Sequence, residues 1–219
     1  RSTPKPSSAA SDVYKRQISD GDKVSWYISV CRSAKIKILP PDVNESEEEF
    51  SVHQPGAIRF GMGGIKSVGV GAVQEIVRAR SEGGPFKDLA DFCNRVSMRI
   101  VNKRVVENLI RSGAMDSFKA NRAQLLSVMD AAIEQGSAYQ KDAESGQMGL
   151  FDDTDVFQVT EIRLPDMEEL PKSIMLQQEK ELLGFYVSGH PLSAYEKVLR
   201  SYTPCLLYTS PSPRDISGS

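Results

Sequence analysis

The stretch that decides the fold is Ile65-Lys66-Ser67-Val68-Gly69-Val70-Gly71-Ala72. It places an apolar-Gly-apolar triplet, Val68-Gly69-Val70, between two segments of helical periodicity near 62–67 and 71–82. We expect the central glycine to allow a backbone turn that a side chain would obstruct, and the two valines to anchor that turn to a core. The turn would then direct backbone N–H groups outward, toward a phosphate.

A second stretch, Leu109-Ile110-Arg111-Ser112-Gly113-Ala114-Met115-Asp116, repeats the arrangement more loosely about 45 residues later. Two such turns form a tandem helix-hairpin-helix pattern, which would hold duplex DNA by its backbone without reading the bases. At each turn the alternative is a helix that ends at a glycine and binds no ligand, and at the second turn the two interpretations are equally supported. The predicted backbone contacts are Val68, Gly69, Val70, Gly71, Gly113, Ala114 and Met115.

Charge is segregated along the chain, although the formal net charge is only -2. Residues 58–122 carry twelve basic and six acidic side chains, whereas 130–181 carry four basic and thirteen acidic ones. A basic block around both turns favours a polyanion as partner, with binding that weakens as salt rises. Two solvated surfaces without any ligand are the alternative. The cations that we expect near phosphates are Lys66, Arg99, Lys103, Arg104, Arg111 and Arg122.

Composition excludes several classes of protein. The 219 residues are 40% hydrophobic and 26% charged, which is typical of a soluble globular chain and too apolar for wholesale disorder. No apolar run approaches the roughly 20 residues that a membrane span needs. The three cysteines have no C-x-x-C spacing, so neither a disulfide framework nor a zinc site is indicated.

Nucleotide-binding motifs do not fit the glycines. Counted from Gly64, the P-loop lysine position holds Val70, and neither Gly61 nor Gly69 opens a complete G-x-G-x-x-G. His190 stands between Gly189 and Pro191 without an acid or nucleophile motif nearby, which favours a structural turn over a catalytic base. We therefore predict no catalytic residue and no metal site in this chain.

The periodicity predicts a mainly α fold with a small α/β part near the N-terminus. A helix from about Asp22 to Ser33, a strand at 36–39 and a hairpin of 50–53 with 57–60 come first. The helices expected after them lie near 62–67, 71–82, 88–94, 102–112, 121–143, 174–183 and 192–201, with an acidic loop at about 144–172.

A short peptide in the acidic region has a composition typical of a docking motif. Gln147-Met148-Gly149-Leu150-Phe151 lies between a polar stretch and Asp152, Asp153 and Asp155. Leu150 and Phe151 would enter an apolar pocket of a partner, with Met148 beside them and directional hydrogen bonds from Gln147. The alternative is that Phe151 packs on this chain's own domain.

The two ends differ from the interior. Residues 1–17 and 204–219 are rich in Ser and Pro, and SAASDVYKRQ and CLLYTSPSPRD resemble translated sequencing-adapter ends. On this hypothesis neither tail belongs to the natural protein, and the natural part is about 18–203.

The order of these segments resembles the C family of bacterial replicative DNA polymerases. The resemblance covers nearly all of the interior and rests on LPPDVNES (39–46), IRFGMGGIKSVGVGAVQEIVRAR (58–80), GPFKDLADFCNRV (84–96), VNKRVVENLIRSGAMDSF (101–118), NRAQLL (121–126), SGQMGLF (145–151) and EKELLGFYVSGHPL (179–192). It implies that the hairpins hold primer-template duplex and that Gln147–Phe151 binds the sliding clamp.

The resemblance also implies a division of the chain. Residues 18–57 would end the fingers domain, 58–145 would form the tandem hairpin domain, 146–173 an acidic linker with the clamp motif, and 174–203 a helical segment leading to an OB-fold. The palm with its Mg²⁺-binding aspartates would lie elsewhere, so no cofactor and no polymerase activity are expected of this bacterial, cytoplasmic fragment alone. Other replicase subunits would bind regions outside it.

Three alternatives stay open. The hairpins could belong to a DNA ligase or repair nuclease, although these would not need QMGLF beside the GHPL segment. The second is a paralogue of the polymerase that is used in damage tolerance. A purely structural interaction domain would bind no nucleic acid.

Overall fold

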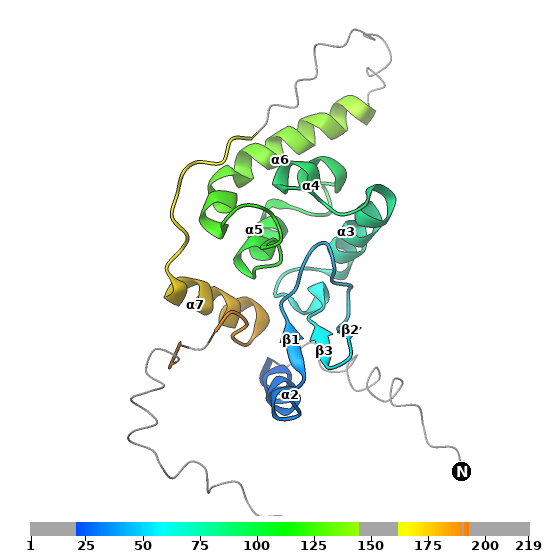
Figure 1. Ribbon diagram of the computed structural model, residues 1–219. Helices are drawn as coiled ribbons and strands as arrows, with labels where there is room; N and C mark the ends of the chain where they lie inside the picture. The colour runs from blue at the N-terminus through cyan, green and yellow to red at the C-terminus, as the bar shows by residue number, and fades with distance from the viewer. Residues whose placement is uncertain (1–20, 145–161, 190, 193–219) are drawn as a thin grey trace, which may run out of the picture. The chain divides into compact units, whose positions relative to one another are not determined.

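The computed structural model describes residues 21–144, 162–189, 191 and 192. Two compact units divide the chain, Arg1–Ser188 and Gly189–Ser219, and every helix and strand with defined bounds belongs to the first. These elements are mainly helices with one small sheet near the start, as the sequence predicted (Figure 1). Within the described residues, no helix is long and apolar enough to cross a bilayer.

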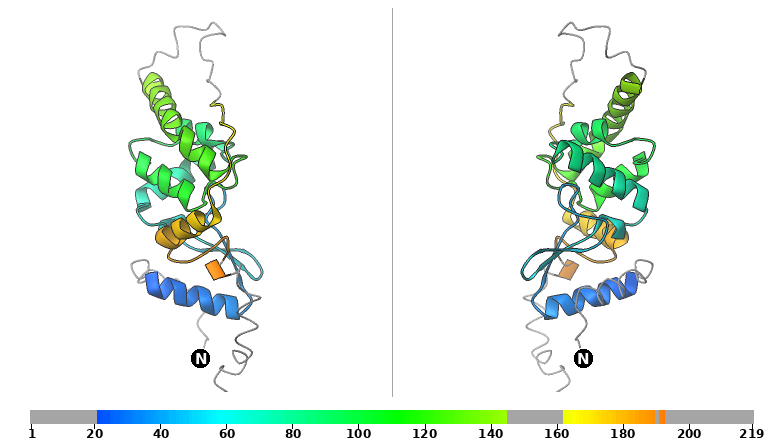
Figure 2. Two further views of the ribbon diagram at one scale, coloured as in Figure 1. Left: turned by 90° about the vertical axis from the view of Figure 1, so that its left-hand side faces the viewer. Right: turned by 90° about the vertical axis from the view of Figure 1, so that its right-hand side faces the viewer.

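The small sheet has three short strands. Helix α2 (Gly21–Ser33) leads into β1 (Lys37–Leu39), which pairs in parallel with β3 (Ala57–Arg59), and β2 (Ser51–Gln54) pairs with β3 in antiparallel fashion. The predicted hairpin is thus confirmed, with Gly56 at a φ of +81° in its turn. Figure 2 shows α2 on the side of the sheet away from α4–α6.

Helices form the rest of the described chain, close to the predicted bounds. The α4 helix packs along α6, while α5 contacts both α6 and α7. Their apolar faces share one core with Ile28 of α2 and with Phe60, which directly follows β3. The segment predicted at 192–201 lies almost entirely outside the described residues. The bounds are α3 Val70–Gly83, α4 Leu89–Arg95, α5 Lys103–Arg111, α6 Arg122–Glu144 and α7 Lys172–Leu183.

The helix predicted over 62–67 is wrong. Only a 3-10 turn, η1 (Met62–Gly64), forms there. Ile65 has extended backbone angles, with φ of -80° and ψ of 126°, and the amide of Lys66 donates to the carbonyl of Leu182 at 2.9 Å instead of continuing a helical ladder. Glycine also weakens a helix because its backbone loses the most freedom on folding.

Helix α6 begins with a reciprocal capping box. The amide of Gln124 donates to Asn121 Oδ1 at 2.8 Å, and the amide of Asn121 donates to Gln124 Oε1 at 3.0 Å. Glu169, far along the chain, accepts from the next two amides, those of Arg122 and Ala123, at 3.1 and 3.3 Å. A carboxylate at this end also complements the helix dipole.

The acidic region is therefore only partly a solvated linker. Residues 162–171 lie in an extended strap along the start of α6, where the carbonyls of Met167 and Pro165 accept from Asn121 Nδ2 and Gln124 Nε2, each at 2.8 Å. We call residues 162–171 the strap. Its glutamate at 169 has a defined structural role, which charge counting alone did not indicate.

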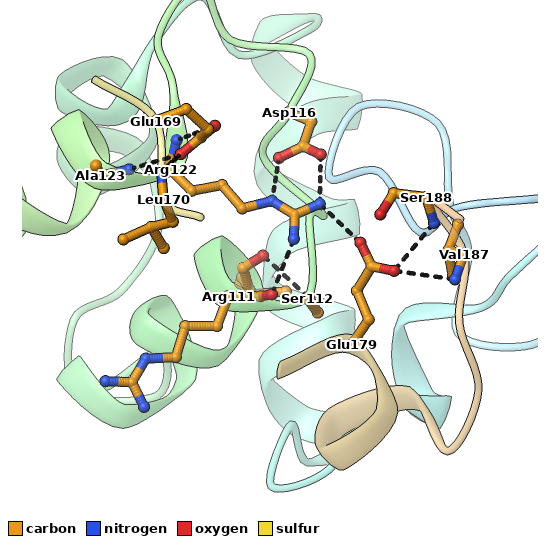
Figure 3. Close-up of polar contacts among 11 residues, drawn as sticks. Arg111, Ser112, Asp116, Arg122, Ala123, Glu169, Leu170, Glu179, Val187 and Ser188 are labelled. Carbon is orange, nitrogen blue, oxygen red and sulfur yellow. Dashed lines mark hydrogen bonds and ion pairs between the residues drawn. The ribbon is translucent and has the colours of Figure 1, made fainter. Parts of the chain in front are cut away.

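Arg122 lies at the centre of a buried polar cluster that joins three segments (Figure 3). Its Nη2 is 2.7 Å from Asp116 and 3.2 Å from Glu179, and its side chain is 4% exposed. Glu179 in α7 is fully buried and also accepts from the amides of Val187 and Ser188 at 2.9 and 3.0 Å. The cluster thus fixes α6 to α7 and to the residues that follow α7.

Burial of the Arg122 guanidinium disfavours its charged form and by itself would lower the pKa of Arg122. The hydrogen bonds that Arg122 donates to Asp116 and the negative charges of Asp116 and Glu179 outweigh that effect, so the pKa of Arg122 is raised above its usual value. The side chain therefore keeps its charge in the interior, where it neutralises two carboxylates.

Removal of this charge should destabilise the fold strongly. We predict that Arg122→Leu lowers the free energy of unfolding by about 3–5 kcal/mol, because Glu179 is left charged, buried and without its cationic partner. Urea denaturation followed by circular dichroism measures the change. The matched control, Arg104→Leu at an exposed position, should change stability by less than about 0.5 kcal/mol. A loss of similar size in both variants would contradict the role of the cluster.

Candidate nucleic-acid interface

The first hairpin is a tight turn that leaves its outer surface exposed. The amide of Val68 donates to the carbonyl of Ile65 at 3.1 Å, which closes a β-turn over Lys66 and Ser67. Ile65 and Val68 are buried at 2% and 6% exposure and hold the turn to the core. The residues that face outward are Lys66, Ser67, Gly69, Val70 and Gly71.

Two details of this turn differ from the prediction. The left-handed residue is Ser67, with a φ of +65°, whereas Gly69 has an ordinary φ of -77° and a Cβ there would meet no atom within 4 Å. Val70 is 51% exposed and does not anchor the turn, because it is the first residue of α3 and only later positions reach the core. The glycines at 69 and 71 therefore leave open space next to the backbone.

The start of α3 presents unpaired amides beside that open space. Gly69 is the N-cap, and its carbonyl accepts from the amides of Ala72 and Val73 at 3.0 and 3.2 Å. Within the described part of the chain, the amides of Val70 and Gly71 have no acceptor. Such amides, together with the positive end of a helix dipole, attract a phosphate.

The second turn is built differently and faces inward. Gly113, at a φ of +83°, ends α5: its amide donates to Ile110 at 3.0 Å, and the amide of Ala114 donates to Leu109 at 2.9 Å. These two bonds are those of a Schellman motif, the glycine-terminated helix that the sequence left as an alternative. Gly113, Ala114 and Met115 are buried, and Ala114 accepts from the amide of Val43 at 2.8 Å. Because these three residues are buried, the prediction that their backbone contacts phosphate is wrong.

The basic block carries less free charge than its sequence count. In the described chain, at least seven of its twelve cations form ion pairs, several with carboxylates outside the block such as Glu47 and Asp130. The net charge of +6 for residues 58–122 therefore overstates the unpaired positive charge that is available to a polyanion. The paired cations are Arg59, Arg78, Arg80, Arg95, Lys103, Arg111 and Arg122.

The six predicted phosphate-contacting cations divide accordingly. Lys66 and Arg104 are exposed and have no ion pair among the described residues, and Arg99 is exposed as well. Arg111 pairs with Glu107 at 2.6 Å. Arg122 is buried in its cluster, which leaves no face for a phosphate and corrects that prediction.

Lys103 is exposed, but its ammonium group already forms an ion pair with Asp130. Its Nζ lies 2.7 Å from Asp130 of α6, and the hydrogen bond to this carboxylate raises the pKa of Lys103. A phosphate would have to compete with Asp130 for the ammonium group. Lys103 is therefore a weaker candidate than Lys66 or Arg104.

Helix α5 brings Arg104 to the first hairpin. Residues Arg104, Asn108 and Arg111 share one face of α5, because positions i, i+4 and i+7 lie on one side of a helix. Asn108 Nδ2 donates to the carbonyl of Lys66 at 3.1 Å, so this face of α5 lies against the hairpin turn. The structure thus places Arg104 of α5 on the helix face that contacts the exposed turn.

The remaining predicted site residues lie outside the described part of the chain. These are the clamp-motif residues Gln147, Met148, Leu150 and Phe151, and His190 lies outside it too. Across the described ranges, no three His, Cys, Asp or Glu side chains gather as a metal site. The family resemblance places its magnesium site in the palm, and we assign the described residues no step of phosphoryl transfer.

Three side chains with defined roles were missed by the sequence interpretation: Asn108, Glu169 and Glu179. Glu169 and Glu179 appeared only as part of an acidic count, since nothing local marks a carboxylate that is used elsewhere in the fold. Asn108 had a detectable signal, its i+4 spacing from Arg104 on a strongly amphipathic helix.

Comparison with known proteins agrees with this geometry. Residues 35–125 match a family described as "Helix-hairpin-helix motif". The chain is 37% identical to DNA polymerase III subunit alpha of Vibrio cholerae over 97% of its own length and 18% of the relative's. It is 46% identical to that of Bacillus subtilis over 83% of this chain and 16% of the relative, and 39% identical to that of Pseudomonas aeruginosa over 91% and 18%.

The chain spans less than a fifth of the length of these curated relatives. Its exposed hairpin lies within the matched helix-hairpin-helix region, and the alignment with the Vibrio cholerae relative extends beyond that region on both sides. The chain is therefore a homologue of one segment of the DNA polymerase III alpha subunits, and this segment contains a helix-hairpin-helix motif.

Proposed function

We propose that this chain is a segment of a bacterial replicative DNA polymerase that contacts the backbone of duplex DNA and docks on the sliding clamp. The observation that supports DNA contact best is the exposed first hairpin, where unpaired amides of α3 lie beside Lys66. We restrict the proposal to this hairpin and the adjoining face of α5. The second turn stabilises the fold instead.

The proposed contact is independent of base sequence. Backbone amides and cationic side chains recognise phosphate groups, which are the same at every position of the duplex. An isolated hairpin of this kind would bind duplex weakly, with a Kd of roughly 10⁻⁴ to 10⁻⁶ M at physiological salt. In the longer polymerase such a contact would hold primer-template DNA without restricting where synthesis occurs.

Clamp docking is proposed for Gln147–Phe151. Its support is the sequence pattern, an amide side chain followed by Leu and Phe anchors among acidic residues. A clamp-bound segment would keep the polymerase near DNA and raise processivity by effective concentration. Packing of Phe151 on this chain is the alternative, which a clamp-binding measurement distinguishes.

The catalytic activity is assigned to other parts of the longer protein. In this proposal the palm supplies the carboxylates for Mg²⁺, so the 219-residue chain alone has no polymerase activity. We also propose a cytoplasmic location and further contacts of the longer protein with other replicase subunits. A damage-tolerance paralogue is a second candidate from the same family, and the alignments with replicative subunits favour the replicative enzyme.

A charge-reversal experiment tests the DNA contact. We predict that Lys66→Glu combined with Arg104→Glu lowers affinity for a 20-base-pair duplex by at least about tenfold. The slope of log affinity against log salt should also become shallower by about two, because two phosphate contacts are lost. Fluorescence anisotropy over a salt series measures both quantities.

The matched control reverses charge at another exposed cation pair, Lys87→Glu with Lys119→Glu, neither of which has an ion pair among the described residues. Equal losses in both double variants would point to bulk charge and contradict a hairpin site. Affinity of the original chain that is indifferent to salt would contradict phosphate recognition altogether.

A second experiment tests clamp docking. We predict that Gln147→Ala combined with Phe151→Ala weakens binding to a bacterial sliding clamp at least about tenfold, because anchor residues dominate such interfaces. Isothermal titration calorimetry measures the affinity. Thr154→Ala with Val156→Ala, just outside the motif, is the control and should bind as the original chain does. Undiminished binding by the motif variant would refute the proposal.

A further inference from the structure

Both main-chain polar groups of Lys66 are held by later parts of the chain. Its amide donates to the carbonyl of Leu182, near the end of α7, at 2.9 Å, and its carbonyl accepts from Asn108 Nδ2 of α5 at 3.1 Å. Asn108 is 8% exposed, so its side-chain amide has little contact with water. A buried donor needs a partner, and among the described residues the Lys66 carbonyl is the acceptor that Asn108 Nδ2 uses.

The bond to the Lys66 carbonyl controls the central peptide of the turn. In the turn Ile65–Val68, the peptide between Lys66 and Ser67 carries the Lys66 carbonyl on one side and the Ser67 amide on the other. Two turn types differ by a flip of this peptide, and only the type II form requires a positive φ at the third residue. Ser67 has a φ of +65°, so the turn has the type II form. This form is unfavourable for a residue other than glycine at the third position.

We propose that Asn108 is a positioning residue that selects this peptide orientation and so directs the Ser67 amide outward, next to the amides of Val70 and Gly71. With its carbonyl directed to α5, the trans peptide must aim its N–H the opposite way. In the described chain the Ser67 amide has no acceptor, and Ser67 itself is exposed. This inference rests on the proposed DNA contact and adds the Ser67 amide to the phosphate-facing set.

The experiment is a rescue test on the whole chain. Asn108→Leu keeps the approximate size of the side chain and its neutrality but removes the donor. We expect duplex affinity to fall about three- to tenfold, because the peptide then flips to the orientation that serine favours. In the double variant Asn108→Leu with Ser67→Gly, most of this loss should be recovered, since glycine accepts a positive φ without penalty.

Ser67→Ala is the matched control, because it also removes the serine hydroxyl but, unlike glycine, does not favour a positive φ. Combined with Asn108→Leu, it should recover nothing. A loss that both Ser67 variants recover equally, or that neither recovers, would assign Asn108 a general structural role and overturn the proposal. Unchanged affinity in Asn108→Leu would overturn it too.

A second measurement separates this inference from the proposed function. The ¹⁵N–¹H signal of Ser67 should shift on Asn108→Leu in the absence of DNA, and return toward its original position with Ser67→Gly. If the original chain binds no duplex at low salt, the proposed function fails while this signal still reports on the turn. An unmoved Ser67 signal overturns the inference alone. If Asn108→Leu does not fold, Asn108→Ser, which is too short to reach Lys66, takes its place in both measurements.

Discussion

The buried charge of Arg122 is the constraint on which the rest of the fold depends. A guanidinium in the interior is tolerated only when carboxylates neutralise it and satisfy its donors, and here Asp116 and Glu179 come from different segments. Glu179 in turn accepts from two amides after α7. Placement of α7 then brings the Leu182 carbonyl to Lys66, so the position of the exposed hairpin depends on this polar cluster.

The two turns show how similar sequences can have opposite uses. Each contains a glycine next to an apolar residue, before α3 in the first turn and after α5 in the second. In the first, the apolar anchors are Ile65 and Val68, the glycines are in open space, and the backbone stays outside. In the second, Gly113 needs its positive φ to end α5, and a Cβ there would collide with Arg122. One glycine leaves room for a ligand, whereas the other leaves room for a structural side chain.

Much of the fold follows from local patterns, and the site follows only in part. Helical periodicity predicted the helices α3–α7 to within a few residues, and the structure shows Asn102 and Asn121 at the start of two of them as caps. The helix over 62–67 failed because the Lys66 amide bonds to the carbonyl of Leu182 in place of a helical acceptor, a long-range contact that periodicity does not reveal. Arg122 was assigned to a phosphate for the same reason: its charge is evident in the sequence, while its buried partner Glu179 lies 57 residues away.

The return of the strap to the start of α6 has a consequence for that helix. The chain leaves α6 at Glu144, and Glu169 then binds the amides of Arg122 and Ala123 at the opposite end of the same helix. Loss of the Glu169 carboxylate would therefore leave first-turn amides of α6 without their acceptors, at the end of the helix opposite to the one from which the chain departs.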